Sequence, residues 1–290
     1  MKRIKILIPI YNDWKSVFKL LENINLQIKN LNIEASIIIV NDASTDLKTE
    51  IDFNLDNLTS VKLINMKKNK GNARCNAAGL KYVYENEDFD FVIPMDGDGE
   101  DRPEELILLI NKAIENFDIV ITADRIKRSE GFFFKFCYLA HKYITFIFTG
   151  KSIKFGNYTC LTKSAVAGMI NEPATWSSFS GSLAKTTKNR KSISSFRGPR
   201  YFGPSKMSFI NLLKHSLSII AVFKSTLLIR SVLFLITYLF LVIGKISAIT
   251  LIPAVAVIIM MVLVIILSRR ENMLEFSNSL ENIKDIEQLK

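Results

Sequence analysis

Cysteine and histidine are scarce in this chain, with three cysteines and two histidines among 290 residues. The cysteines, Cys75, Cys137 and Cys160, lie far apart and form no Cys-x-x-Cys pair. Disulfide frameworks need several spaced cysteines in a secreted chain, and structural zinc sites need clustered cysteine and histidine ligands. The sequence therefore argues against both a disulfide framework and a zinc site.

Acidic residues are almost absent from the middle of the chain. Residues 131–270 hold 18 Lys and Arg against one acid, Glu172, whereas residues 1–130 hold 18 against 22 and residues 271–290 hold two against five. The net charge of +10 is therefore concentrated in one segment. Such a field suits anionic lipid head groups and phosphorylated ligands. Nucleic acid is the rival partner, but no nucleic-acid motif is present, so we expect none.

Charge of either sign is nearly missing from residues 227–267, where Arg230 and Lys245 are the two charges in 41 residues. About 20 apolar residues cross a bilayer. The run therefore predicts two spans, roughly 227–243 and 246–267, turning at Gly244-Lys245; the alternative is a buried core hairpin. The N-terminal run "MKRIKILIPIYND" has no cleavage site, which indicates a first strand rather than a signal peptide.

The first 125 residues alternate short Val/Ile-rich runs with helical patterns. Buried parallel strands are predicted at residues 4–10, 35–42, 60–66, 90–96 and 118–124, and helices at 13–28, 71–86 and 102–116. This alternation is typical of a doubly wound α/β sheet. Ligands of such sheets bind at the carboxyl ends of the strands, and the polar clusters lie there. They are Tyr11 to Asp13, Asn41 to Asp46, Asp96 to Asp101, and Arg125.

The acidic stretch "DGDGEDRPEELI" begins like a calcium-binding EF-hand loop, but its sixth residue is Asp101 instead of Gly and its twelfth is not Glu. The chain also contains neither a P-loop nor a Gly-x-Gly-x-x-Gly fingerprint. Asp96 and Asp98 remain as two oxygen ligands at a strand end, suited to a hard divalent cation that binds a diphosphate. Taken alone, an Asp-x-Asp pair is more often a solvated turn.

Five motifs occur together and in order: "IPIYND", "IIIVNDASTD", "NKGNARCNAAGL", "FVIPMDGDGEDRPEEL" and "RYFGPSK". This set resembles the family-2 glycosyltransferases, in the membrane-tethered branch typified by dolichol-phosphate mannose synthase and bactoprenol glucosyltransferase. The resemblance covers residues 4–125 well and 197–268 in outline. It implies a GT-A fold, the Rossmann-like fold of nucleotide-diphospho-sugar transferases, and a hexosyltransferase activity of the EC 2.4 type.

The resemblance also implies roles for individual residues. It places a nucleoside pocket at Pro9, Tyr11 and Asp13, and a base contact at Asp42, where "VNDAS" stands for the family's "VDDGS". The metal, Mg²⁺ or Mn²⁺, and the diphosphate would be held by the Asp-x-Asp pair. The remaining residues implied in the site are Asp96, Asp98, Glu100, Arg125, Arg200 and Lys206. Asp101 is expected to cap the helix that starts near Pro103.

The charge pattern bears on the acceptor. A hydroxyl acceptor needs a general base, whereas a phosphate is already ionised and needs cations nearby. The basic excess favours a polyprenyl phosphate (undecaprenyl or dolichyl), with inverting transfer from a nucleoside diphosphate sugar for cell-envelope glycan synthesis. The stretch "FGNYTCLTK" departs from the family's acceptor motif, because Asn157 replaces an acid and Thr159 a base. A hydroxyl of a lipid-linked or envelope glycan stays an alternative acceptor, and a catalytically silent membrane scaffold is an alternative of another class.

Two further stretches, residues 131–148 and 206–224, have the Lys and aromatic pattern of interfacial amphipathic helices, or of ordinary core helices. The expected organisation is a glycosyltransferase domain at 1–205, a juxtamembrane helix at 206–226, two transmembrane helices at 227–268 and a cytoplasmic tail at 269–290. The tail is expected to form an amphipathic helix, which mediates homo-oligomerisation or docks on the basic domain, or else a solvated, partly ordered end. We expect a multi-pass protein of the cell inner membrane with the catalytic domain and both termini in the cytoplasm.

Overall fold

The computed structural model describes residues 1–48, 54–127, 142–204 and 209–290. The chain forms two compact units. The sheet unit comprises Met1–Ser129, Lys154–Lys206 and Asn272–Lys290, and the helical unit comprises Glu130–Ile153 and Met207–Glu271.

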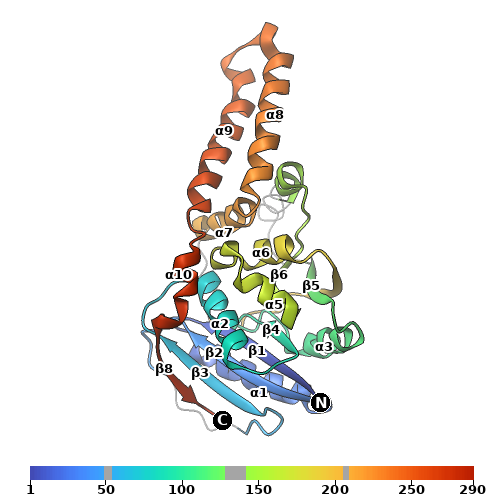
Figure 1. The fold of residues 1–290 in the computed structure, drawn as a ribbon, viewed down its shortest axis with the longest axis vertical. Helices are drawn as coiled ribbons and strands as arrows, with labels where there is room; N and C mark the ends of the chain where they lie inside the picture. The colour runs from blue at the N-terminus through green and yellow to red at the C-terminus, as the bar shows by residue number, and fades with distance from the viewer. Residues whose placement is uncertain (49–53, 128–141, 205–208) are drawn as a thin grey trace. The chain divides into compact units, whose positions relative to one another are not determined.

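The sheet unit is built on one mixed sheet whose strands run in the order β7-β5-β6-β4-β1-β2-β3-β8 (Figure 1). β1, β2, β3 and β4 are mutually parallel neighbours, and β1 and β2 end together because Ile10 pairs with Asn41. The loops after these strands therefore meet at one edge. The strand bounds are β1 Lys2–Ile10, β2 Ile33–Asn41, β3 Ser60–Met66, β4 Phe91–Pro94, β5 Val120–Lys127, β6 Phe155–Thr162, β7 Arg190–Phe196 and β8 Ile283–Gln288.

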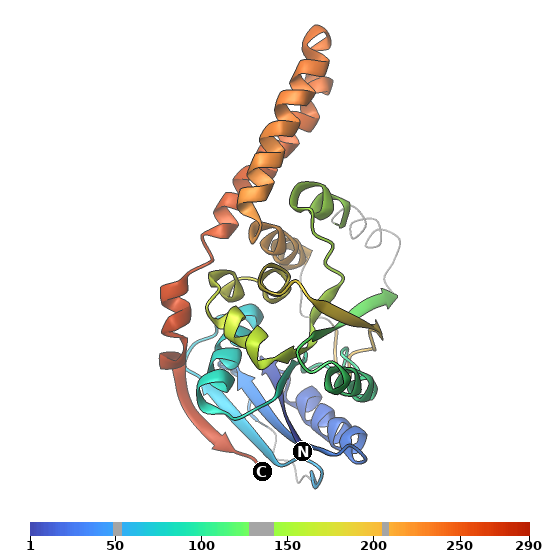
Figure 2. The same ribbon diagram turned by 45° about the vertical axis from the view of Figure 1, so that its right-hand side comes forward.

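Helices cover both faces of this sheet (Figure 2). α1 and α3 pack against each other on one face, and α2, α5 and α6 pack together on the other. At Gly79 of α2, an added Cβ would lie 2.6 Å from the Leu7 side chain of β1, so glycine permits the close approach of helix and sheet. The helical bounds are α1 Trp14–Ile28, α2 Asn72–Asn86, α3 Leu106–Glu115, α5 Lys163–Ile170 and α6 Phe179–Thr186, with short 3₁₀ turns η1 Pro103–Glu105 and η2 Pro173–Trp176.

The five predicted strands and three predicted helices of the first 125 residues are confirmed, with shifts at their ends. Strand β6 was not predicted, because "FGNYTCLT" was interpreted as part of an acceptor motif. It inserts between β4 and β5 and is antiparallel to both. The sheet is therefore mixed, and β5 does not neighbour β4.

The tail differs most from its prediction. Instead of one amphipathic helix it forms α10 (Met273–Ser277), a 3₁₀ turn η4 (Ser279–Asn282) and strand β8, which pairs antiparallel with β3. The helical prediction was wrong because β3 would otherwise present an open edge of unpaired backbone groups, and pairing satisfies them. Figure 1 shows β8 (red) alongside β3 (light blue).

The helical unit contains α7 (Phe209–Ala221), α8 (Lys224–Val242), η3 (Ile243–Lys245) and α9 (Ala248–Ser268). α8 and α9 are long and apolar enough to cross a membrane, and only 11% and 17% of their most apolar windows are buried. A buried core hairpin is therefore a poor description, and the predicted pair of apolar helices turning near Gly244 is confirmed. Most of the predicted helix at 131–148 lies outside the described residues, although residues 142–149 are helical.

Arg230, a charge inside the first apolar run, has a structural partner within the helical unit. Its Nη1 donates a hydrogen bond to the carbonyl oxygen of Ile147 at 2.8 Å. Ile147 lies in the last turn of the helix at residues 142–149, where backbone carbonyls carry partial negative charge. Arg230 thus caps that helix.

Candidate active site

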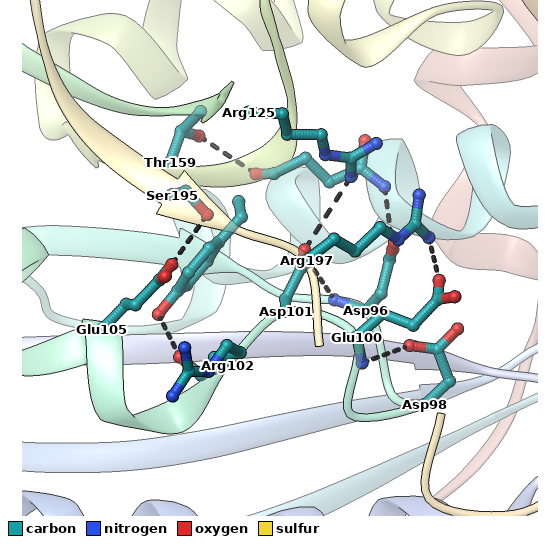
Figure 3. A network of polar contacts seen from close by, with 12 residues as sticks. Asp96, Asp98, Glu100, Asp101, Arg102, Glu105, Arg125, Thr159, Ser195 and Arg197 are labelled. Atoms are coloured by element: carbon teal, nitrogen blue, oxygen red, sulfur yellow. Dashed lines mark hydrogen bonds and ion pairs between the residues drawn. The ribbon is translucent and has the colours of Figure 1, made fainter. Parts of the chain in front are cut away.

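The acidic loop, residues 95–102, follows β4 at the carboxyl edge of the sheet (Figure 3). Its first backbone N–H, that of Met95, donates to the Leu7 carbonyl at 2.9 Å. Within the loop, Asp98 Oδ1 accepts from the N–H of Glu100 at 2.9 Å, and Asp101 Oδ2 accepts from the N–H of Asp96 at 3.0 Å. Side chains thus hold the loop's backbone in shape.

The expected helix cap at Asp101 is therefore wrong. The 3₁₀ turn begins after Arg102 without a side-chain cap, and the Asp101 carboxylate turns back into its own loop. Asp101 is only 4% exposed, and Arg125 lies 3.8 Å from its other oxygen. The buried Asp101 carboxylate is stabilised by the Asp96 N–H and the Arg125 guanidinium, and these two partners take the place of the helix cap.

A basic segment, residues 197–201, follows β7 and lies along the acidic loop. Two backbone hydrogen bonds join them, from Gly198 N–H to Glu100 O at 2.9 Å and from Tyr201 N–H to Asp98 O at 3.0 Å. Arg197 forms an ion pair with the Glu100 carboxylate. The buried carboxylate of Glu105 anchors the end of β7 by accepting from Ser195 Oγ at 2.7 Å and Phe196 N–H at 2.9 Å (Figure 3).

Arg200 connects two predicted site residues. Its Nη1 lies 2.5 Å from Asp98 Oδ2, and its Nη2 lies 2.7 Å from Asp13 Oδ2. The fork of the guanidinium thus bridges the loop after β1 and the loop after β4. Its Nε atom is buried and has no hydrogen-bond partner among the described residues. Lys206, the other basic residue expected here, lies outside the described residues.

Gly99 separates Asp98 from Glu100 in the middle of the acidic loop. Its φ is +86°, and an added Cβ would lie 2.5 Å from the ring of Tyr201. Glycine is therefore needed both for the backbone conformation and for the close approach of Tyr201. The Tyr201 hydroxyl in turn accepts from Asn23 Nδ2 of α1 at 2.8 Å.

The clustered carboxylates change one another's proton affinity. Burial raises the pKa of Asp98 to about 6, and the negative charge of Asp96 adds to this, against the Glu100 N–H and Arg200. Burial and Asp96 likewise raise the pKa of Asp101 to about 7. Burial alone would lower the pKa of Arg197, but the surrounding carboxylates raise it above its usual value. Burial therefore sets the proton affinity of both aspartates first, and the neighbouring charges adjust it.

β6 places Asn157 beside the acidic loop. The Asn157 Nδ2 atom donates to Asp96 Oδ1 at 3.1 Å and lies 3.5 Å from Asn72 Oδ1, at the start of α2. The guanidinium of Arg125 packs over Gly156, where an added Cβ would lie 2.7 Å from its Nη2. Asn157, like Arg197, was not among the predicted site residues, and its place became clear only with β6.

The predicted nucleoside side lies after β1 and β2. Pro9 is buried in β1, Tyr11 is 44% exposed, and Asp13 accepts from Ser16 Oγ and pairs with Arg200. Asp42 is 4% exposed, and its two oxygens accept from the N–H groups of Lys70 and Gly71 at 2.8 and 2.7 Å. Asp42 thus holds the loop that leads into α2, and its base contact stays a prediction.

The donor set of the acidic loop fits a divalent cation. Asp96 and Asp98 supply hard oxygen ligands, and Asp98, whose pKa is raised first by burial and then by Asp96, carries a charge that a cation would stabilise. The described residues contain no group of three or more His, Cys, Asp or Glu arranged for a metal. The remaining ligands would therefore come from a bound diphosphate and water, as in open magnesium sites.

Known proteins match this architecture. Residues 5–172 match the family model for glycosyl transferase family 2. The undecaprenyl-phosphate 4-deoxy-4-formamido-L-arabinose transferase of Salmonella choleraesuis (strain SC-B67) is 27% identical over 235 residues, which are 78% of this chain and 69% of that protein.

Two solved structures share the fold. The mannosyltransferase PcManGT from Pyrobaculum calidifontis, in complex with GDP-Man and Mn²⁺, aligns with a TM-score of 0.52 at 14% identity over 96% of this chain and 86% of that one. Glucosyl-3-phosphoglycerate synthase from Mycobacterium tuberculosis, with Mn²⁺, UDP-glucose and glycerol 3-phosphate, aligns with a TM-score of 0.54 at 13% identity over 78% and 80%. The family model spans more than half of the chain. The chain therefore belongs to glycosyl transferase family 2 and is a glycosyltransferase with a GT-A-like fold.

Proposed function

We propose that this enzyme transfers a sugar, with inversion, from a nucleoside diphosphate to a polyprenyl phosphate at the cytoplasmic face of the inner membrane. The observation that carries the proposal is the contact between the acidic loop and the basic segment, in which Arg200 joins Asp13 to Asp98. It brings nucleoside-side and diphosphate-side residues to one point of the sheet edge. The Salmonella relative is an undecaprenyl-phosphate 4-deoxy-4-formamido-L-arabinose transferase, which supports the acceptor class.

In this proposal, Asp96 and Asp98 hold Mg²⁺ or Mn²⁺, which when bound neutralises charge on the diphosphate. Pro9, Tyr11 and Asp13 line the nucleoside side, and Asp42 shapes it. Arg200 and Arg125 supply fixed positive charge beside the phosphates. Lys206 is proposed to add a further positive charge there. Glu100 contributes to the donor-sugar side of the site, where its ion pair fixes the position of Arg197.

The reaction needs no proton acceptor in this scheme. An oxygen of the lipid phosphate attacks the anomeric carbon, and the bond from that carbon to the diphosphate oxygen breaks, so the electron pair leaves with the nucleoside diphosphate. Asp101 has the proton affinity of a useful base, but its burial and its hydrogen bond from Asp96 N–H keep it from a substrate. A phosphate acceptor, already ionised, fits this site better than a hydroxyl.

Charges at the ends of the apolar helices support the proposed orientation. Lys224 begins α8, and Arg269 and Arg270 follow α9, whereas the turn between the helices carries Lys245 alone. Lys and Arg concentrate on the cytoplasmic side of membrane spans. Both ends of the hairpin would then face the cytoplasm, together with the sheet unit to which the chain connects them.

The test incubates the purified full chain with labelled nucleotide sugars, Mn²⁺ and undecaprenyl phosphate. We expect a charged, acid-labile lipid product, and none from Asp98→Ala with unchanged circular dichroism. Labelling of a glycan hydroxyl alone would contradict the phosphate acceptor. Turnover by Asp98→Ala equal to that of the unchanged chain would contradict the site, and no turnover at all would favour a silent scaffold.

A further inference from the structure

The C-terminal strap, residues 272–290, returns to the sheet unit directly after the apolar hairpin. α9 ends at Ser268 and α10 begins at Met273, so few residues separate the two units here. The strap then runs along the edge of the sheet, where β8 pairs with β3. Figure 1 shows α10 and β8 beside α2 and β3. None of the roles proposed above uses this segment.

The strap binds the β3–α2 loop, residues 67–71, through its backbone. The N–H of Lys67 donates to the carbonyl of Asn282 at 2.7 Å, and Asn282 Nδ2 donates to the carbonyl of Lys68 at 3.1 Å. Lys67 Nζ also donates to the carbonyl of Glu281 at 2.8 Å. Two of these three bonds use the loop's own backbone, the Lys67 N–H and the Lys68 carbonyl, and so fix the path of the loop directly.

Glu275 of α10 joins this loop to two helical elements. Its Oε1 accepts from Lys70 Nζ at 2.9 Å, and its Oε2 accepts from the indole N–H of Trp176 at 2.9 Å and lies 3.6 Å from Arg74 of α2. The hydrogen bonds from Lys70 and Trp176 lower the pKa of Glu275. The carboxylate is therefore ionised and shared among three donors at neutral pH.

An aromatic contact seats Glu275 at this place. Phe276 is fully buried and stacks on Trp176, with ring centroids 5.4 Å apart and planes 20° apart. The Arg74 guanidinium also lies over the Trp176 ring, 5.4 Å from its centroid. Burial of two large rings gives the strap an attachment much stronger than an exposed ion pair alone.

The same loop is held from its other side by Asp42. The backbone N–H groups of Lys70 and Gly71, next to the side chain that Glu275 binds, donate to the two Asp42 oxygens. Gly71 has a φ of +90°, a conformation that few other residues adopt. Lys70 thus touches the strap with its side chain and the candidate nucleoside pocket with its backbone.

We propose that the C-terminal strap is a positioning element for the nucleotide donor, with Glu275 holding the β3–α2 loop so that Asp42 and the start of α2 keep the geometry of the nucleoside pocket. Glu275 is a positioning residue, because it acts through Lys70 and Arg74. This inference rests on the proposed function for the identity of the ligand. The strap follows α9 directly along the chain. The geometry of the donor pocket would therefore depend on the segment that continues from the apolar hairpin.

The test uses the full chain in lipid nanodiscs and compares Glu275→Ala with Glu281→Ala. Glu281 is an exposed acid on the same strap, so its removal changes the net charge equally. Amide hydrogen exchange of residues 67–71 is measured without ligand, and the Kd values of UDP and GDP are measured by calorimetry with Mn²⁺. For Glu275→Ala we expect faster exchange at Lys70 and Gly71 and a Kd raised roughly three- to tenfold, with kcat changed less than twofold.

Glu275→Gln keeps a hydrogen-bond acceptor but loses the charge, so its exchange rates and Kd values should lie between those of Glu275→Ala and those of the unchanged chain. Glu281→Ala should match the unchanged chain. Unaltered exchange in Glu275→Ala overturns the proposal, and so does faster exchange with an unaltered Kd. If the unchanged chain binds neither UDP nor GDP, the proposed function itself fails, and the donor role of the strap fails with it. The ligand-free exchange measurement separates these two failures.

Discussion

In the sheet unit the large apolar side chains are inside, and Ile6, Leu7 and Ile8 are 0% exposed. In the helical unit Phe240, Leu241 and Ile249 are 76%, 72% and 78% exposed. A protein that met only water would not expose so continuous an apolar surface. The comparison teaches that the two units place their apolar side chains oppositely, inward in the sheet unit and outward in the helical unit. The candidate site of the sheet unit depends on a few charged side chains in contact, whereas the exposed surface of α8 and α9 is mostly apolar.

The strongest way to sharpen this comparison is Asp98→Asn in the sheet unit. The change keeps the size of the side chain but removes the charge that pairs with Arg200 and that would hold the cation. We expect kcat/KM to fall about 10²- to 10³-fold, because electrostatic groups at a reacting diphosphate contribute on that scale. Steady-state kinetics measures it, with Asp88→Asn as the control, since the Asp88 side chain is 68% exposed and precedes β4, whereas Asp98 follows that strand. Equal losses in both variants would contradict a specific site.

A charge introduced into the helical unit tests whether α9 crosses a membrane. Ile259→Lys places an ammonium group in the middle of α9, where we expect insertion to become less favourable by about 3 kcal/mol. The fraction of protein in carbonate-washed membranes should fall sharply, whereas Ile259→Leu should leave it unchanged. Leu47→Lys, at a side chain 93% exposed in the sheet unit, is the matched control and should have no effect. Full membrane retention of Ile259→Lys would argue against a spanning helix.

The pH dependence of stability tests how strongly the sheet unit holds its buried charges. In the folded protein, burial raises the pKa of Asp101 to about 7, from 3.8 for an ordinary aspartate. The folded state then binds more protons than the unfolded state between these values, so stability falls as the pH rises through that interval. In Asp101→Asn the melting temperature should fall less between pH 4.5 and pH 8. Curves parallel to those of the unchanged chain would show that Asp101 titrates normally.

The smallest expected effect concerns a strained backbone position. Ala43 has a φ of +57°, a left-handed conformation that costs a residue with a Cβ about 1 kcal/mol or more. Ala43→Gly should therefore raise the melting temperature by about 2–4 °C. Ala35→Gly, within β2, is the control and should lower it, because Ala35 lies in regular strand. A destabilised Ala43→Gly would mean that the surrounding structure already compensates for the strain.

Local patterns predicted most of the fold. The Val/Ile runs at β1 to β5, the helical spacing of α1 to α3 and the two long apolar runs of α8 and α9 each carry their signal within one element. Of the site, the acidic loop and Arg200 were predicted from motifs, and the structure brings Asp13, Asp98 and Arg200 into contact. Arg197 and Asn157 were missed, because no spacing in the sequence connects Glu100 with Arg197 or Asp96 with Asn157.

The sequence by itself determined the strands and helices of the first 125 residues and the two long apolar helices, because hydrophobic periodicity and apolar length are local properties of the chain. Only the tertiary structure decided which elements are neighbours: that β6 lies between β4 and β5, that the tail pairs with β3 as β8, and that Asp101 turns inward rather than capping a helix. The physical reason is that an open strand edge or a buried carboxylate takes the best partner within reach in space. The strand partners lie tens to hundreds of residues away along the chain, and Asp101 takes the N–H of Asp96, five residues back, together with the more distant Arg125.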